Sequence, residues 1–472
     1  MGVYLNPGKT AYEEAIHSKI FVDKTEMVRY LNSVVKTKQK YVSVSRPRRF
    51  GKTLAADMIC AYYDRKAESR ELFEKLKIAG NVSDNSGLAW DLYLGKFDVI
   101  RITMTRFLKE KADVLTALEV MQSLVIRDYK KAYPGAELFD EGDLIQTIDD
   151  IYSENDRQVV IVIDEWDAVF RERQDDREGQ KEYLDFLRDL MKDNSHVALA
   201  YMTGILPIKK YGKHSALNMF DEYSMMTPMQ LAPYTGFTGE EVKELCRAYG
   251  RDYEKMKAWY DGYEVSDIIP PDPNYAVKET TGKELPAKHY SIYSPLSVVK
   301  AVTTGIIQNF WNKTETYEAL AEYIRKDFDG LKEAVTLLMS GGRLVVDTGT
   351  YQNDMTTFTC RDDVLSLLIH LGYLGYDNEK GEVFIPNKEI LDEFKASTKG
   401  SEWVSAFKAY EISEELLKAT WDMDEEKVAE MVEDAHNQAG NKTYNNEAAL
   451  SYGIQLAYNS YEEPVHGSSS GL

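Results

Sequence analysis

Three arginines and a lysine lie within the seven residues from Arg46 to Lys52, in the stretch SRPRRFGKT. A loop that binds phosphate needs backbone N–H groups around the anion, a lysine for its oxygens, a hydroxyl for Mg²⁺ and a helix that begins at the anion. Gly51, Lys52 and Thr53 supply the lysine, the hydroxyl and the start of a helix. The stretch therefore predicts a phosphate-binding loop.

The loop departs from the usual pattern GxxxxGK[ST] at its first position, where Arg46 replaces glycine. An arginine fits there only if the local backbone avoids a positive φ. Arg46, Arg48 and Arg49 have three alternative roles: phosphate ligands, an arginine finger that bridges subunits, or a solvated turn. We favour a phosphate role for at least one of them, and we place Phe50 with them among the nucleotide-binding residues.

Two carboxylates, Asp164 and Glu165, end the run QVVIVIDE, whose five consecutive β-branched residues are typical of a strand buried on both faces. An ATPase of the P-loop class needs an acid at the tip of a neighbouring strand for Mg²⁺, and commonly a glutamate that polarises the attacking water. We expect Asp164 and Thr53 to bind the metal. Glu165 and Lys52 are the expected catalytic residues.

A third candidate catalytic residue is Thr203, which lies near the end of the run VALAYMTG. At this place related ATPases carry a group that senses the γ-phosphate. A hydroxyl at a strand end also often bonds to the backbone, so both roles stay open.

Apolar runs at 41–44, 97–102, 158–163 and 197–204 alternate with helical patterns such as LAADMICAYYDR and KEYLDFLRDLMKD. Strands that alternate with helices predict a doubly wound parallel α/β sheet, here of the P-loop NTPase class (ASCE/AAA-like). We expect this ATPase core to span residues 1–234.

The chain changes character after residue 234. Helical pieces, GEEVKELCRAYG and YEKMKAWYDGY, lead to a proline-rich loop at 268–273. Residues 362–395 predict helix, strand, turn, strand and helix, so residues 235–400 are expected to form a mostly helical, winged-helix-like lid region. Residues 401–472 predict helix followed by a disordered tail, HGSSSGL.

Composition excludes several classes of protein. The net charge of −21 argues against general binding of polyanions, and residues 362–395 lack the basic cluster that DNA contact needs. No run of 18 apolar residues and no signal sequence is present, which predicts a cytoplasmic protein without a membrane span. Cys60, Cys246 and Cys360 lack CxxC spacing, so neither a disulfide framework nor structural zinc is expected.

Five strings in this order resemble the bacterial AAA-ATPase-like family: SRPRRFGKT, VVIVIDEWD, YMTGILPIKKYG, LAPYTGFT and WYDGY. The resemblance covers about residues 1–400. It implies a P-loop ATPase of the STAND or archaeal type that uses ATP and Mg²⁺, with Lys52, Thr53, Asp164 and Glu165 matching the Walker motifs. Arginine in place of the first glycine is normal in that family, which implies a true phosphate loop.

The family commonly carries a PD-(D/E)XK nuclease-like domain at its carboxyl end. YNNEAALSYGIQLAY, at 444–458, resembles the first helix of that domain, with Glu447 at a candidate site position. A nuclease would need two later strands, one with an aspartate and one with (D/E)xK, and this sequence ends before them. Glu425-Glu426-Lys427 fits ExK by letter only, because it lies in an acidic helical run before Glu447. The segment YSPLS at 293–297 also departs from the family's YNPWS. We therefore expect no nuclease activity in this chain.

Three functions remain open at this stage. The leading one is an ATPase that hydrolyses ATP as a regulatory or motor module. The alternatives are a nucleotide-dependent switch without turnover, and the motor half of a nucleic-acid processing enzyme. A protein partner or a second copy of the chain is an expected contact, and nucleic acid is a weaker one.

Overall fold

The computed structural model describes residues 2–80, 88–109, 113–208, 217–267, 288–311, 317–326, 328, 330–353, 355–398, 416 and 418–438. Several predictions fall outside these ranges. They concern the proline-rich loop at 268–273, the segment 444–458 with Glu447, and the tail HGSSSGL.

The amino-terminal part contains a five-stranded parallel sheet in the order β2-β3-β4-β1-β5. Its strands are β1 (Tyr41–Ser45), β2 (Asp98–Thr103), β3 (Val159–Asp164), β4 (Val197–Gly204) and β5 (Asp221–Tyr223). Every residue of β1, β3 and β4 is buried. The uninterrupted apolar run of β3 predicts this burial, whereas the run that became β1 alternates and predicts only a strand. The three-residue strand β5 was not predicted.

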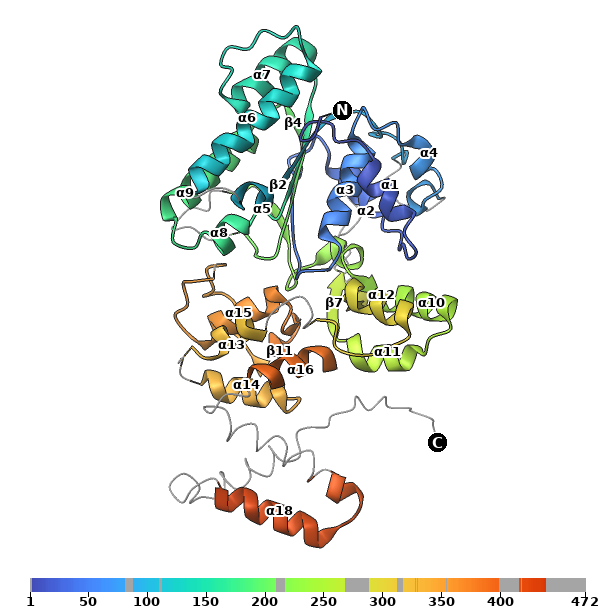
Figure 1. Ribbon diagram of the computed structural model, residues 1–472, viewed down its shortest axis with the longest axis vertical. Helices are drawn as coiled ribbons and strands as arrows, with labels where there is room; N and C mark the ends of the chain where they lie inside the picture. The colour runs from blue at the N-terminus through green and yellow to red at the C-terminus, as the bar shows by residue number, and fades with distance from the viewer. Residues whose placement is uncertain are drawn as a thin grey trace, which may run out of the picture.

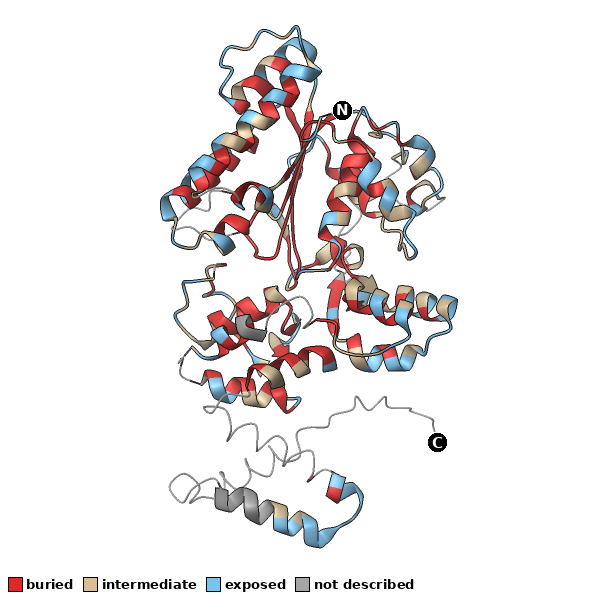
Figure 2. Cartoon of the chain, viewed as in Figure 1, coloured by how far each residue is buried: buried red, intermediate tan, exposed pale blue. Residues whose placement is uncertain are grey.

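Helices cover both faces of this sheet (Figure 1). One face packs on α1 (Thr10–Ile16), α2 (Met27–Val34) and α3 (Lys52–Tyr63). The other packs on α5 (Met104–Leu108), α6 (Val114–Ala132), α7 (Leu144–Asn155), α8 (Ala168–Glu172) and α9 (Arg177–Met191). Figure 2 shows buried residues through the sheet between the two layers. The predicted doubly wound α/β fold is therefore confirmed.

The strand register brings polar residues together at the carboxyl ends of the strands. Thr103 of β2 pairs with Asp164 of β3, and Asp164 pairs with Thr203 of β4. Ser45, the last residue of β1, pairs with Gly204. Because these strands are parallel, their carboxyl ends lie together at one end of the sheet. The loop to α3 leaves the sheet at this end.

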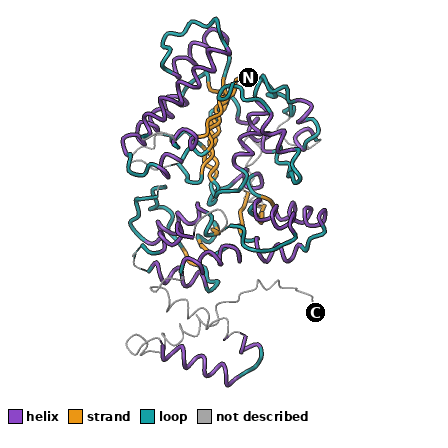
Figure 3. The backbone as a smooth tube through the Cα atoms, viewed as in Figure 1, coloured by secondary structure: helices purple, strands orange, loops and turns teal. Residues whose placement is uncertain are grey.

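Two smaller sheets lie in the carboxyl-terminal part (Figure 3). The first joins β6 (Phe237–Thr238), β8 (Lys288–Tyr293) and β7 (Tyr263–Asp267), and packs with the helices α10 (Gly239–Tyr249), α11 (Tyr253–Tyr260) and α12 (Pro295–Thr304). The predicted helical pieces are present. However, Tyr263, which was read with the helical piece before it, begins a strand that pairs with β8 across a long sequence gap.

The second small sheet has the order β10-β11-β9. Helix α15 (Arg361–Leu371), β10 (Gly375–Asp377), β11 (Glu382–Phe384) and α16 (Lys388–Ser397) follow one another as predicted for residues 362–395, and β9 (Leu344–Val345) pairs beside β11. Helices α13 (Tyr317–Ile324) and α14 (Leu331–Met339) complete this unit. The boundaries 1–234, 235–400 and 401–472 stay predictions.

The remaining described elements are short or peripheral. They are α4 (Arg70–Phe73), the 3₁₀ helices η1 (Lys77–Ala79) and η2 (Met229–Tyr234), and α18 (Glu425–Gln438), which contains the acidic run predicted to be helical. Among the described residues no helix is long and apolar enough to cross a membrane.

Candidate phosphate and magnesium site

The loop between β1 and α3 has the backbone that an arginine at position 46 requires. The backbone angle φ is positive at Arg49 (69°) and Gly51 (84°) but not at Arg46. Gly51 is the N-cap of α3, and no side chain caps the first turn. The first N–H groups of a helix have no acceptor within it, so this turn presents donors to an anion.

Lys52 lies under this loop and is only 8% exposed. Its Nζ donates to the carbonyl oxygens of Arg46 (2.8 Å) and Pro47 (2.7 Å). Burial lowers the pKa of Lys52 to about 8, while the charges of Asp167 and Asp164 act in the opposite direction. A cation that is poorly solvated and lies beside amide donors is suited to bind phosphate oxygens.

The three arginines of the loop have different surroundings. Arg46 is 2% exposed, and its Nη1 donates to the carbonyl oxygens of Ser45 and Tyr223 at 3.0 Å each. Burial lowers the pKa of Arg46 to about 10, and its Nη2 has no acceptor in the described part of the chain. Arg48 is exposed and Arg49 is half-buried. Burial thus excludes a solvated turn for Arg46, and the phosphate roles stay predictions.

The loop also contacts the carboxyl-terminal part. Arg49 Nη1 donates to the carbonyl oxygen of Trp311 at 3.2 Å, and the guanidinium of Arg49 lies 5.9 Å from the centre of the Trp311 ring. Phe50 packs edge-on against Tyr263, with 5.4 Å between the ring centres. The N–H of Gly236 donates to the carbonyl oxygen of Phe50 at 2.8 Å. The loop is therefore linked directly to the first small sheet through Tyr263 and to the carboxyl-terminal part through Trp311.

Asp164 is 1% exposed, and its Oδ2 accepts from Nη2 of Arg101 at 3.1 Å. The same Nη2 lies 3.3 Å from Asp57 on α3. Oδ1 of Asp164 is buried and has no hydrogen-bond partner among the described residues. An unpaired buried carboxylate oxygen is costly, so this atom is suited to bind Mg²⁺ or its water ligands.

Magnesium would need further oxygen ligands at this place. The hydroxyl of Thr53 is on an exposed residue at the start of α3, next to Lys52. In the described ranges no three His, Cys, Asp or Glu side chains converge to hold a metal ion. The unpaired Oδ1 of Asp164 and the hydroxyl of Thr53 would suit Mg²⁺ whose other ligands are phosphate oxygens and water.

Glu165 follows β3 in a left-handed conformation with φ 53°. Its Oε2 accepts a hydrogen bond of 2.5 Å from the hydroxyl of Thr105, in the helix that follows β2. A non-glycine residue with positive φ is strained and is often found at functional sites. The strained turn and Thr105 together fix the orientation of this carboxylate.

Thr203 is fully buried, and its hydroxyl has no hydrogen-bond partner in the described part of the chain. Its carbonyl oxygen accepts from the N–H of Trp166 at 3.1 Å. The alternative role was a hydrogen bond from this hydroxyl to the backbone, and the structure contains no such bond among the residues it describes. The expected role as a γ-phosphate sensor stays a prediction.

Asp167 and Arg171 belong to the same edge, and sequence reasoning missed them. Oδ2 of Asp167 accepts from the N–H groups of Ile205 (3.0 Å) and Leu206 (2.9 Å) and from Nε of Arg171 (3.0 Å). It therefore ties the turn after β3 to the loop after β4. Asp167 and Arg171 are four residues apart in the sequence, a spacing that favours an ion pair on a helix and could have indicated this pair.

Gly204, at the end of β4, keeps this arrangement close-packed. A Cβ at this position would lie 2.8 Å from Nε1 of Trp166 and 2.9 Å from Oδ1 of Asp167. We expect Gly204→Ala to lower the free energy of unfolding by about 1–3 kcal/mol, as overpacking of a core does. Urea titration would measure it. Gly135→Ala is the matched control, because a Cβ there meets no atom within 4 Å; equal losses in both variants would contradict this packing.

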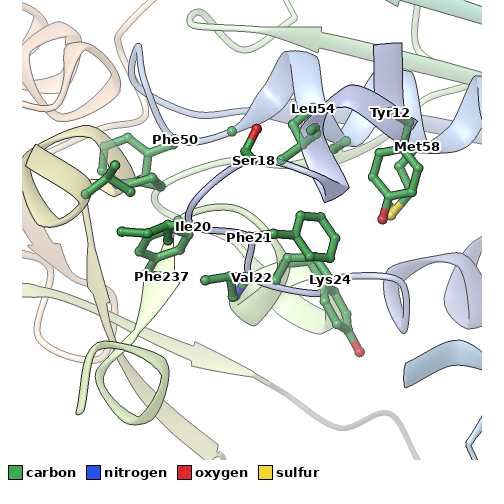
Figure 4. Close-up of a pocket in the computed structure, with 17 residues that line it drawn as sticks. Tyr12, Ser18, Ile20, Phe21, Val22, Lys24, Phe50, Leu54, Met58 and Phe237 are labelled. Carbon is green, nitrogen blue, oxygen red and sulfur yellow. The ribbon is translucent and has the colours of Figure 1, made fainter. Parts of the chain in front are cut away.

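A cavity of about 230 Å³ adjoins the loop. It follows α3 from Gly51 through Leu54 and Ala55 to Met58, and the segment from Ile20 to Val22 forms its opposite wall (Figure 4). The rest of its lining comes from Tyr234 and, in the carboxyl-terminal part, from Gly236, Phe237, Pro295 and Val299. The cavity is therefore a mainly apolar slot beside the start of α3.

Comparisons with known proteins bear on the amino-terminal part. Residues 8–213 match the family model described as AAA-ATPase_like, a predicted AAA-ATPase. This span is less than half of the chain, so the similarity is to the sheet-containing part. The resemblance expected out to about residue 400, and the association with a nuclease-like domain, stay predictions.

The chain is also similar to an uncharacterized protein in the vnfD 5′ region of Azotobacter chroococcum mcd 1. The two are 25% identical over 226 residues, which are 47% of this chain and 41% of that protein. The chain thus spans about two fifths of the length of that relative. The relative's description names no activity.

Among solved structures, the Aeropyrum pernix ORC2 protein in ADPNP–ADP complexes overlaps with 80% of this chain and 96% of its own. The identity is 12% and the TM-score is 0.28. A likeness of that size supports no argument about function. The fold assignment follows from the parallel sheet, its register and its two helical layers.

Proposed function

We propose that the chain is a P-loop ATPase that binds ATP and hydrolyses it with Mg²⁺. The observation that carries this proposal is the convergence of four groups at one edge of a parallel sheet. They are the buried ammonium of Lys52, the unpaired oxygen of Asp164, the carboxylate of Glu165 on a backbone with positive φ, and the unpaired hydroxyl of Thr203. The family similarity over residues 8–213 supports it.

Each of these groups has a distinct task in the proposed reaction. Lys52 and the first N–H groups of α3 bind phosphate oxygens, and Thr53 and Asp164 would hold Mg²⁺. When bound, the metal neutralises charge on the phosphates. Glu165 orients the attacking water and takes up its proton, and Thr203 donates to the terminal phosphate. Stabilisation of this kind dominates phosphoryl transfer, because the protein does little covalent chemistry.

The cavity beside α3 gives the rest of the nucleotide a place. Between Gly51 and Met58 an α-helix rises by roughly 10 Å at about 1.5 Å per residue. A ribose and base that extend from phosphates at the start of α3 would need a slot of that length. We propose that the base lies in this cavity.

The charge of Lys52 makes nucleotide binding depend on pH. Its folded-state pKa of about 8 means that the ammonium is lost as the pH rises through that value. Because only the ammonium attracts phosphate, we expect the Kd for ATP to be constant below about pH 7 and to rise about tenfold per pH unit above 8. Titrations with ATP from pH 6.5 to 9.5 at constant ionic strength would measure this.

Lys52→Arg is the control for this pH profile, since an arginine keeps its charge over the whole range. Its Kd should not change with pH, even if binding is weaker than in the wild type. A wild-type Kd that stays flat up to pH 9.5 would contradict loss of the Lys52 charge in this range, and Lys52→Ala then decides whether the ammonium binds the phosphates.

A nucleotide-dependent switch without turnover is the second candidate function. The contacts of Arg49 with Trp311 and of Phe50 with Tyr263 favour it, because they link the loop directly to the carboxyl-terminal part. Phosphate bound in the loop would compete for Arg49 and so alter that link. Release of inorganic phosphate separates the two functions, since a switch would bind ATP and leave it intact.

A further inference from the structure

The cavity beside α3 contains a polar group that the protein itself does not use. Tyr12 of α1 lines it and is 1% exposed, yet its hydroxyl has no hydrogen-bond partner among the described residues. Its ring is fixed by stacking on Phe73 at 5.6 Å and by an edge contact with Phe21. A buried hydroxyl without a partner is costly, so a bound ligand is expected to satisfy it.

Among the described residues that line the cavity, Lys24 alone carries a charged side chain. Its Nζ donates to the carbonyl oxygen of Pro233 and to Oε2 of Glu241, at 2.6 Å each. Burial lowers the pKa of Lys24, and the charge of Glu241 opposes that shift. An ammonium has three N–H donors, so one remains for a ligand.

The main chain of the wall opposite α3 is also available. Ile20, Phe21 and Val22 make no backbone hydrogen bond within the described part of the chain. These groups offer both N–H donors and carbonyl acceptors beside an apolar slot. A flat ring with a polar edge matches this combination of aromatic walls, unpaired main chain and the polar groups of Tyr12 and Lys24.

We propose that Tyr12 and Lys24 determine which base the site accepts by hydrogen-bonding the polar edge of a purine. Lys24 donates to a ring nitrogen or a carbonyl oxygen of the base. The hydroxyl of Tyr12 accepts from, or donates to, the neighbouring atom. Phe21 and Leu54 pack against the ring faces. This inference rests on the proposed function, since the phosphates at Lys52 direct the base into the cavity.

The test compares Tyr12→Phe with wild type for three probes with Mg²⁺: ATP, GTP and inorganic tripolyphosphate. We expect wild type to bind one purine nucleotide more tightly than tripolyphosphate. Tyr12→Phe should lose roughly tenfold in affinity for that nucleotide, as loss of one hydrogen bond does, and nothing for tripolyphosphate. Lys24→Gln should change the ratio of the ATP and GTP affinities in the same titrations.

Folding is checked by thermal melting without ligand. Because the hydroxyl of Tyr12 has no partner in the free protein, Tyr12→Phe should melt at the wild-type temperature or higher. Tyr41→Phe is the matched control: it loses a 2.8 Å bond to the carbonyl oxygen of Met191, near the start of β1, and should bind all probes like wild type.

Unchanged purine affinity in Tyr12→Phe would overturn the inference and leave the proposed function intact. An equal loss for tripolyphosphate would overturn it as well, because the effect would then not come from the base. Failure of the wild type to bind any of the three probes would instead overturn the proposed function.

Discussion

Lys52→Ala is expected to weaken the binding of ATP by roughly 100-fold or more, the cost of losing a charged hydrogen-bond donor from a buried site. The ammonium lies under the loop, held by the carbonyl oxygens of Arg46 and Pro47. Alanine leaves the first turn of α3 as the remaining phosphate ligand. Calorimetric titration of both proteins with ATP and Mg²⁺ at pH 7 would measure the difference.

Lys40→Ala is a matched control for this experiment. Lys40 lies at the other end of β1, and its Nζ also donates to two carbonyl oxygens, those of Asn194 (3.0 Å) and Val197 (2.8 Å). Its removal should affect the free energy of unfolding to a similar degree but leave the Kd for ATP unchanged. Equal affinities in wild type and Lys52→Ala would mean that the loop does not bind phosphate.

Glu165→Gln is expected to lower the rate of ATP hydrolysis by roughly 10²–10⁴-fold, the range typical of general bases, while the Kd for ATP stays within a few-fold of wild type. Glutamine is nearly the same size and can still accept from the hydroxyl of Thr105, but it cannot take up a proton. Phosphate release and nucleotide titration on the same preparation would separate the two effects.

Glu172→Gln serves as the control for this substitution, since Glu172 is an exposed residue at the end of the neighbouring helix α8. Its turnover should equal that of the wild type. If Glu165→Gln hydrolysed ATP at the wild-type rate, the water would have to be activated by a different group.

Much of the amino-terminal fold could be predicted, because the evidence is local. The run that became β3 is apolar without interruption, which is typical of a strand buried on both faces, and the run that became β1 alternates as a strand does. Asp164 and Thr203 were identified because each lies at the end of such a run. The order β2-β3-β4-β1-β5 depends on contacts between distant segments, which one sequence does not contain.

Burial separates residues that look alike in the sequence. Arg46 and Arg48 are two residues apart, yet the first is buried and the second is exposed. Asp167 was not identified from the sequence, although its Oδ2 accepts three hydrogen bonds. Such roles depend on groups from β4 and the loop after it, so only the folded chain shows them.

Strands β7 and β8 were missed for a related reason. The segments YEVSD and KHYSIY are polar on alternate positions and short, and neither is a strand without the other. Tyr12 escaped notice as well, because a tyrosine on an amphipathic helix predicts ordinary core packing. Its unpaired hydroxyl and the cavity become visible only when α1, α3 and the carboxyl-terminal part are brought together.

The most direct measurement is a calorimetric titration of the wild-type protein with ATP and Mg²⁺ at pH 7, followed by an assay for released phosphate on the same sample. We expect saturable binding of one nucleotide per chain and a steady release of phosphate. Binding without release would contradict the hydrolysis and favour the switch. No binding at millimolar ATP would contradict the central claim that the loop from Arg46 to Thr53 holds a nucleotide.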